Sequence, residues 1–160
     1  MAAVQGLQGQ PFTLGPVSST SPHEPIPADL ARPDVVAACM KHFVGYMASR
    51  SGYDRGPADL PEVALRSYFL PPFAAAVRAG VASAMTAYGS VDGLPVAISR
   101  KWSRMWLRNE TAFAGLLVTD WLVVYNLITD HYTVETGLEA VELLMSWSST
   151  DMVRAAVISP

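Results

Sequence analysis

Short apolar runs alternate with stretches of helical spacing along the chain, and this alternation limits the fold more than any other feature. The runs cover residues 35–43, 81–88 and 115–119. Each is short and almost free of charge, which is typical of a strand buried on both faces. Helical spacing of apolar side chains follows the first two runs, at residues 62–80 and 99–110. A chain of this kind folds into parallel strands joined by right-handed helical crossovers.

A third helix is expected after the last run, from Thr133, a suitable N-cap, to about Trp147. The side chains that recur near its helical period, and are expected to face the core, are Val134, Leu138, Val141, Leu144 and Met145. In the helix over 99–110 the side chains expected to face inward are Trp102, Met105, Trp106 and Leu107. The expected order is therefore strand, helix, strand, helix, strand, helix.

The predicted fold class is α/β with parallel strands, either a small doubly wound sheet or a partial (β/α)8 barrel. The 160 residues fall short of the ~250 that are typical of a closed barrel. Since 51% of them are hydrophobic, the chain can bury a sizeable core. Residues 10–33 are rich in proline and serine, and this composition predicts a loop.

Composition argues against several classes of ligand and partner. The net charge is −3 and no lysine or arginine run occurs, which argues against nucleic acid. No apolar run reaches the ~18 residues of a membrane span, and residues 1–12 lack the basic start and apolar core of a signal peptide. GxGxxG, P-loop, HExxH and paired-cysteine patterns are absent, so no metal or cofactor is predicted. The single cysteine, Cys39, is expected to be a small core residue.

Each apolar run ends in side chains that can contact a polar ligand. They are Lys41, His42, Met85, Tyr88, Asp120 and Trp121. The carboxyl ends of parallel strands lie on one face, so we expect these side chains to gather at one mouth, where a carboxylate such as Asp120 is a common catalytic group. The other side chains of similar chemistry, interpreted as packing or solvated groups, are Trp102, Trp106, Trp147 and His131.

Three longer blocks stand out in the sequence. They are "KHFVGY", "LRSYFLPPFAAAVRAGVASAMTAYGSVDGLPV" and "LRNETAFAGLLVTDW". Together they resemble the barrel domain of glycoside hydrolase family 3, of the β-glucosidase type, in the family's order and approximate spacing. The resemblance extends from about residue 6 to residue 152. It implies that residues 1–160 are the second half of a (β/α)8 TIM-type barrel, and that an α/β-sandwich domain bearing the catalytic acid lies outside this chain.

The resemblance also implies roles for the residues at the strand ends. Asp120, in "TDW", would be the nucleophile of a retaining β-glucosidase. Lys41 and His42 would bind hydroxyls of the sugar at the catalytic subsite. Tyr88 would lie beside the nucleophile, and Trp121 would stack on or flank the sugar ring. These expectations describe one sugar site built from three strand ends.

The resemblance implies one further sugar contact, and two other positions also bear on the site. An arginine in the loop after "KHF" would reach the sugar, and spacing does not decide between Arg50 and Arg55, of which Arg55 is favoured. Met85 is expected to contact the substrate from the second run. Gly89 stands where the family commonly has asparagine, so the sequence departs from the family pattern beside Tyr88 without losing a catalytic side chain.

Retaining glycoside hydrolysis needs a carboxylate that attacks the anomeric carbon and an acid ~5–5.5 Å away that protonates the leaving oxygen. A cation at Lys41 would help to keep Asp120 ionised. The expected substrate is a β-glucoside or oligosaccharide, with no cofactor, and missing parts of the same enzyme would complete the site. A non-catalytic carbohydrate-binding remnant is the alternative. The chain lacks the Asp-x-His loop of the family's N-acetylglucosaminidase branch, which favours glucosides.

Overall fold

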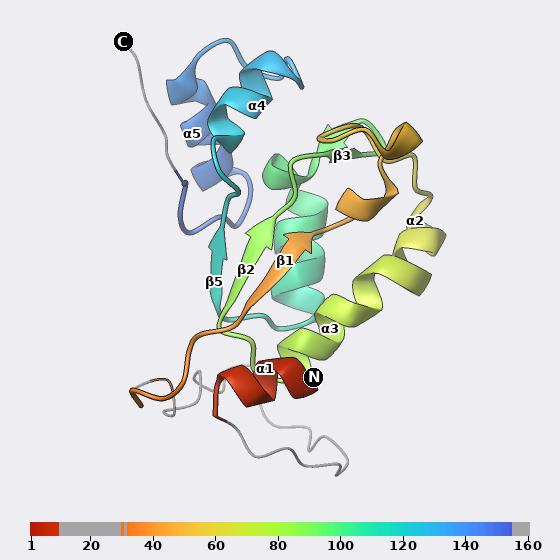
Figure 1. Cartoon of the computed structure of the whole chain (residues 1–160). Coiled ribbons are helices and arrows are strands. Elements are labelled where there is room, and N and C mark those ends of the chain that lie inside the picture. The colour runs from red at the N-terminus through yellow and green to blue at the C-terminus, as the bar shows by residue number, and fades with distance from the viewer. Residues whose placement is uncertain (10–29, 31, 155–160) are drawn as a thin grey trace.

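The computed structural model describes residues 1–9, 30 and 32–154, and its centre is a small parallel sheet (Figure 1). The sheet contains β1 (Cys39–Phe43), β2 (Ser83–Thr86) and β5 (Leu116–Val118), in the order β1-β2-β5. Each strand lies inside one of the predicted apolar runs, and the parallel α/β prediction is confirmed. Most of the predicted loop over residues 10–33 lies outside the described residues.

The end of the described chain returns to the sheet beside β5. Val118 bridges Met152 in parallel orientation, and the Thr119 N–H donates to the Met152 carbonyl at 3.0 Å. Because β2 occupies the other side of β5, this segment extends the sheet by a fourth parallel position at the edge opposite β1.

One helical segment joins β1 to β2. It consists of α2 (Glu62–Ala64), the π-helical turn η4 (Leu65–Phe69) and α3 (Leu70–Arg78). The helical spacing predicted over residues 62–80 is confirmed, and the helical segment ends before Gly80, whose φ is +76°, a conformation that glycine adopts without strain.

A second helical segment joins β2 to β5. The short η5 (Val96–Ile98) precedes the π-helical η6 (Lys101–Glu110). Three of the four predicted inward side chains are buried, but Met105 is 54% exposed. In a π-helix the hydrogen bonds run from i to i+5, so Trp102 shares a face with the residues four and five positions later, and Met105 is turned outward.

The core lies between these helices and one face of the sheet. Its strand residues are Met40, Phe43, Ala84 and Leu117, and its helix residues are Leu65, Leu70, Trp102, Trp106 and Leu107. The Phe43 ring stacks on Trp106 with 5.7 Å between centroids. Burial of these apolar side chains supplies the main stabilising free energy of the sheet.

The opposite face of the sheet is open. Cys39, Ser83 and Leu116 are register partners on this face, and Leu116 is 43% exposed. The prediction that Cys39 is a core residue is wrong, since its side chain is exposed. Successive strand residues point to opposite faces, and the core-facing position is taken by Met40.

Two further helices follow β5 and form a second apolar cluster. They are α4 (Val123–Thr129), which the sequence analysis did not predict, and α5 (Gly137–Ser146). The N-cap of α5 is Thr136 instead of Thr133, and it forms a capping box with Glu139. Of the side chains predicted to face the core only Leu144 is fully buried, while Leu138 and Met145 are exposed. Trp147, predicted to pack, is also exposed.

Short elements complete the described chain. They are α1 (Ala2–Leu7), η2 (Tyr46–Ala48), η3 (Arg50–Gly52), β3 (Ser90–Val91) and β4 (Leu94–Pro95). Strands β3 and β4 form an antiparallel hairpin whose turn residues, Asp92 and Gly93, both have positive φ, as Asp-Gly hairpin turns require. Among the described residues, no helix is both long and apolar enough to cross a membrane.

Candidate active site at the carboxyl ends of the strands

Asp120 lies two residues after β5, where the buried strand reaches the mouth of the sheet. Asp120 is buried, with only 8% of the residue exposed. One carboxylate oxygen, Oδ2, lies 3.3 Å from His42 Nε2, and the other, Oδ1, accepts the Trp121 backbone N–H at 2.7 Å. Both oxygens therefore have a partner, so the carboxylate has a fixed orientation.

The end of β1 brings an imidazole to this carboxylate, and the phenol of Tyr46, the first residue of η2, lies beside that imidazole. His42 is partly buried, and its ring centroid lies 5.1 Å from that of Tyr46. The Tyr46 hydroxyl donates to the Asp54 carboxylate. Burial, and then the hydrogen bond to Asp54, raises the pKa of Tyr46 to about 12. Sequence reasoning missed Tyr46, although it closes the "KHFVGY" block.

Tyr88, two residues after β2, connects the other two strand ends. Its hydroxyl donates to the Trp121 carbonyl at 2.5 Å. Burial raises the pKa of Tyr88, and the negative charge of Asp120 raises it further. His131 Nε2 lies 2.7 Å from the Tyr88 carbonyl, so the interpretation of His131 as a solvated residue is wrong. It supports the Tyr88 backbone.

The two candidate arginines have different surroundings. Arg50 donates from Nε to Asp59 at 2.8 Å on the surface. The Arg55 guanidinium lies over the Tyr88 ring, 4.4 Å from its centroid, and 3.7 Å from the Asp54 carboxylate. The structure therefore brings Arg55 to the cluster and pairs Arg50 elsewhere.

The loop that carries Arg55 is held against the chain that follows β2. The Ala58 N–H donates to the Ser90 carbonyl at 2.8 Å. A Cβ atom on Gly89 would lie 2.7 Å from the Gly56 carbonyl oxygen, so a glycine is required for this close approach. The departure of Gly89 from the family's asparagine thus has a structural consequence.

Lys41 and Met85 are less closely tied to Asp120. Lys41 is exposed on β1, and its side chain forms no ion pair or hydrogen bond with another described residue. The structure therefore does not pair it with Asp120. Met85 is partly buried on β2. Its register partner is Val118, which lies two residues before Asp120.

Trp121 and Arg154 form the outer side of the cluster. Trp121 is 51% exposed, and the Arg154 guanidinium lies 5.5 Å from its ring centroid. The Arg154 N–H donates to Thr119 Oγ1 at 2.9 Å. The sequence did not indicate Arg154, because the segment before it contains only one residue that pairs with the sheet, Met152, and no apolar run.

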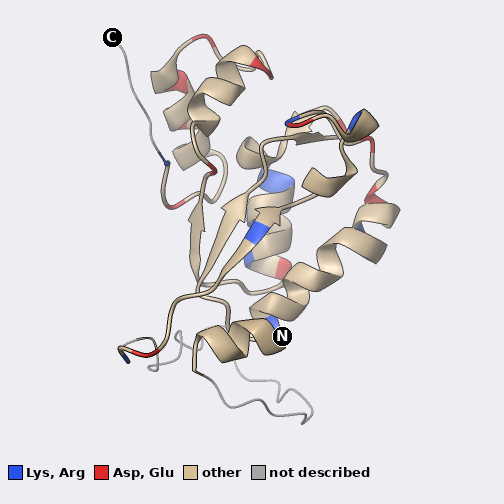
Figure 2. Cartoon of the chain, viewed as in Figure 1, with Lys and Arg blue, Asp and Glu red and all other residues tan. Residues whose placement is uncertain are grey.

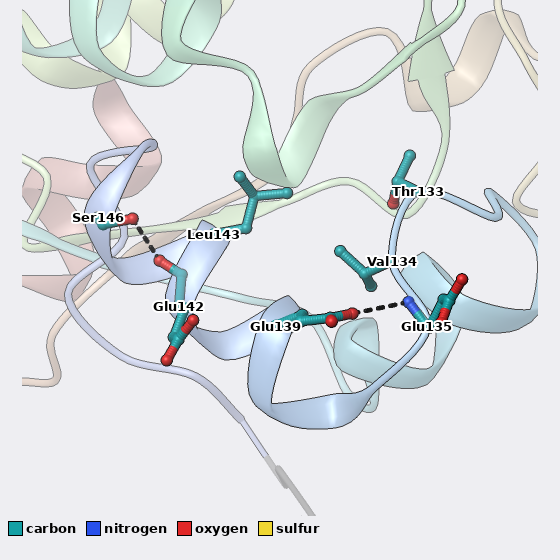
Figure 3. A pocket seen from close by; sticks show the side chains of 7 residues that line it. All are labelled: Thr133, Val134, Glu135, Glu139, Glu142, Leu143 and Ser146. Carbon is teal, nitrogen blue, oxygen red and sulfur yellow. Dashed lines mark hydrogen bonds between the residues drawn. The ribbon is translucent and has the colours of Figure 1, made fainter.

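A pocket of about 590 Å³ lies elsewhere, against α5, and is shown in Figure 3. Its lining residues are Thr133, Val134, Glu135, Glu139, Glu142, Leu143 and Ser146. None is a candidate from a strand end. Glu139 accepts the backbone N–H groups of Glu135 and Thr136, and these hydrogen bonds lower the pKa of Glu139. It acts as part of the helix cap. Within the described residues, no cluster of His, Cys, Asp and Glu could hold a metal ion.

The cluster of Asp120 with a histidine, aromatic rings and an arginine at parallel strand ends is accompanied by a family match over almost the whole chain. Residues 1–152 match the glycosyl hydrolase family 3 N-terminal domain. The chain belongs to glycoside hydrolase family 3.

Similar proteins are named as glycosidases. The lysosomal beta glucosidase of Dictyostelium discoideum is 38% identical over 143 residues, which are 88% of this chain and 16% of that protein. A beta-xylosidase of Formosa agariphila is 41% identical over 106 residues, which are 66% of this chain and 15% of that protein. This family 3 chain therefore spans only a small part of the length of these relatives.

Solved structures agree with the fold. The beta-glucosidase of Listeria innocua in complex with gluconolactone superimposes with a TM-score of 0.80 at 30% identity, over 97% of this chain and 19% of that one. A mutant of the same enzyme in complex with laminaribiose gives a TM-score of 0.77 at 28% identity, over 97% and 19% of the two chains. The prediction of a partial TIM-type barrel is confirmed.

Proposed function

We propose that this chain is the second half of the catalytic barrel of a retaining β-glucosidase and carries its nucleophile, Asp120. The observation that carries the proposal is the position of Asp120, buried at the end of β5 and 3.3 Å from His42, in a chain of family 3. The sugar-bound Listeria innocua structures support a sugar as the ligand of this site.

The proposed reaction begins with attack of an Asp120 carboxylate oxygen on the anomeric carbon. The bond to the leaving oxygen breaks, and that oxygen takes a proton from an acid. We propose that the acid belongs to a part of the protein outside this chain. Water then attacks the glycosyl ester, gives up its proton to the same acid, now ionised, and releases glucose with its β configuration retained.

Neutral phenols and an aromatic face surround Asp120. Tyr46 and Tyr88 both have a raised pKa, so both phenols stay neutral and keep the hydroxyl hydrogens that they donate to Asp54 and to the Trp121 carbonyl. The half-exposed Trp121 offers a flat apolar wall for the CH face of a sugar ring. Lys41, His42 and Arg55 are proposed to contact the sugar as the resemblance implies, and Met85 is proposed to contact it from β2.

The test uses the full-length protein that contains this chain. It is supplied with aryl β-glucoside, β-xyloside and N-acetyl-β-glucosaminide, and proton NMR follows the first sugar released. We expect the glucoside to react fastest and the β anomer to appear first. Release of the α anomer would contradict retention, and binding without hydrolysis of any substrate would support the carbohydrate-binding remnant instead.

A β-xylosidase is the second candidate, because the Formosa agariphila relative bears that name. Faster hydrolysis of the xyloside in the same assay would favour it. This outcome would change the sugar and leave the proposed role of Asp120 intact.

A further inference from the structure

Basic residues occur at three places around the candidate site. Figure 2 shows lysine or arginine on β1 and at the end of the described chain, close to the carboxyl ends of the strands. The residues concerned are Lys41 on β1, Arg55 over Tyr88 and Arg154 over Trp121. A chain with a net charge of −3 thus presents cations at the mouth where its buried carboxylate, Asp120, lies.

Arg154 is held in place by the backbone of the sheet. Met152 bridges Val118, and the Arg154 N–H donates to Thr119 Oγ1 at 2.9 Å. Thr119 is buried and directly precedes Asp120. The residues at the end of β5 therefore fix the position of the Arg154 main chain relative to the Asp120 carboxylate.

The charge of Arg154 is not neutralised by a described carboxylate. Arg55 lies 3.7 Å from Asp54, whereas Arg154 forms no ion pair within residues 1–9, 30 and 32–154. Its described partner is the π face of Trp121, 5.5 Å away. A cation over an aromatic face keeps its charge and can still bind an anion.

Exposure increases from Asp120, at 8%, to Trp121, at 51%, and Arg154 is exposed beyond them. The attacked carbon must meet Asp120, so the part of the substrate nearest Arg154 is the outer, leaving-group part. This step rests on the proposed role of Asp120. We propose that Arg154 binds an anionic group of the leaving group, so that the substrates include β-glucosides with an acidic aglycone.

The test compares two thio-β-glucosides that are not hydrolysed, one with a carboxyphenyl and one with a carbamoylphenyl aglycone. The two have similar shapes and differ in charge. Their dissociation constants are measured by calorimetry for the full-length protein and for Arg154→Met. We expect the preference for the carboxylate to fall threefold or more in the variant, which is the size expected of a partly exposed ion pair. High salt should reduce the same preference in the unmodified protein.

Two controls locate the effect. Arg154→Lys keeps the charge and should retain most of the preference. Arg100→Met removes a guanidinium that lies over another tryptophan, Trp147, at 5.7 Å, and should leave the preference as it was. A fall of less than threefold in Arg154→Met, or no binding of the carboxylate ligand, would overturn the inference. If the preference falls in Arg154→Met but the protein hydrolyses no glycoside, the proposed function fails and the anion site stands.

Discussion

The buried side chain of Gln8 should make a large contribution to the stability of the sheet, although no sequence pattern singles it out. Gln8 is 0% exposed. Its Oε1 accepts the N–H groups of Ala38 at 3.1 Å and Ala82 at 3.0 Å, and its Nε2 donates to the Gly80 carbonyl at 2.8 Å. One amide thus joins the segments that lead into β1 and β2.

Gln8→Ala would leave two buried N–H donors without a partner. Each such donor costs about 1–3 kcal/mol. Gly80 is a partly exposed residue whose carbonyl can turn to water, so we assign it little cost. The expected loss is therefore about 2–6 kcal/mol, and its lower end corresponds to amide exchange about 30-fold faster at Ala38 and Ala82.

Hydrogen exchange of the Ala38 and Ala82 amides, read by mass spectrometry or NMR, measures this loss locally. Gln5→Ala is the matched control, because Gln5 lies one turn away on α1 and alanine is a better helix former. It should change exchange at these amides very little. Unchanged protection in Gln8→Ala, or an equal loss in Gln5→Ala, would show that the Gln8 amide does not stabilise these two segments.

Three other predictions concern the site. Gly89→Ala should destabilise the protein by about 1–3 kcal/mol and raise KM, because its Cβ would lie 2.7 Å from the Gly56 carbonyl oxygen and displace the Arg55 loop. Urea unfolding measures the stability and steady-state kinetics measure KM. A variant with the stability and KM of the unmodified protein would contradict this prediction. His42→Ala should lower kcat/KM for an aryl β-glucoside more than ~100-fold, since it removes the neighbour of Asp120; unchanged kinetics would show that His42 is structural. Tyr46→Phe should reduce the fall in Tm between pH 10 and pH 12. The pKa of Tyr46 is about 12 in the folded protein against an ordinary value of 10.0, so the unfolded chain ionises first as pH rises and the folded state loses stability. An identical dependence of Tm on pH in the variant would show that Tyr46 does not contribute to this loss.

The sequence was sufficient to predict the parallel strands, because strands buried on both faces are short continuous apolar runs. It was insufficient for α4. The apolar run continues from Trp121 into that helix without a polar break, and the helix begins after Leu122 in a left-handed conformation that non-glycine residues rarely adopt. The first residue of α5 could have been predicted from the sequence. Thr136 and Glu139 have capping-box spacing, whereas Thr133 has no glutamate three residues later.

The candidate site was partly predictable for the same reason as the sheet. The rule that parallel strands end on one face predicted that His42, Tyr88 and Asp120 would come together, and the structure places them so. It could not predict which arginine approaches, because loop geometry places Arg55 over Tyr88 and Arg50 against Asp59. Arg154 was beyond prediction, since it depends on the isolated pairing of the chain end with β5.

The proposed role of Asp120 as the nucleophile is tested by trapping the glycosyl ester. The full-length protein is treated with a β-glucoside that has a good leaving group and a fluorine in place of the hydroxyl beside the anomeric carbon. Fluorine slows both chemical steps by destabilising the oxocarbenium-like transition state, and the leaving group keeps formation faster than breakdown. Peptide mapping by mass spectrometry should place the ester on Asp120, and Asp120→Gly should form none. An ester on another carboxylate would contradict the assignment of Asp120 as the nucleophile.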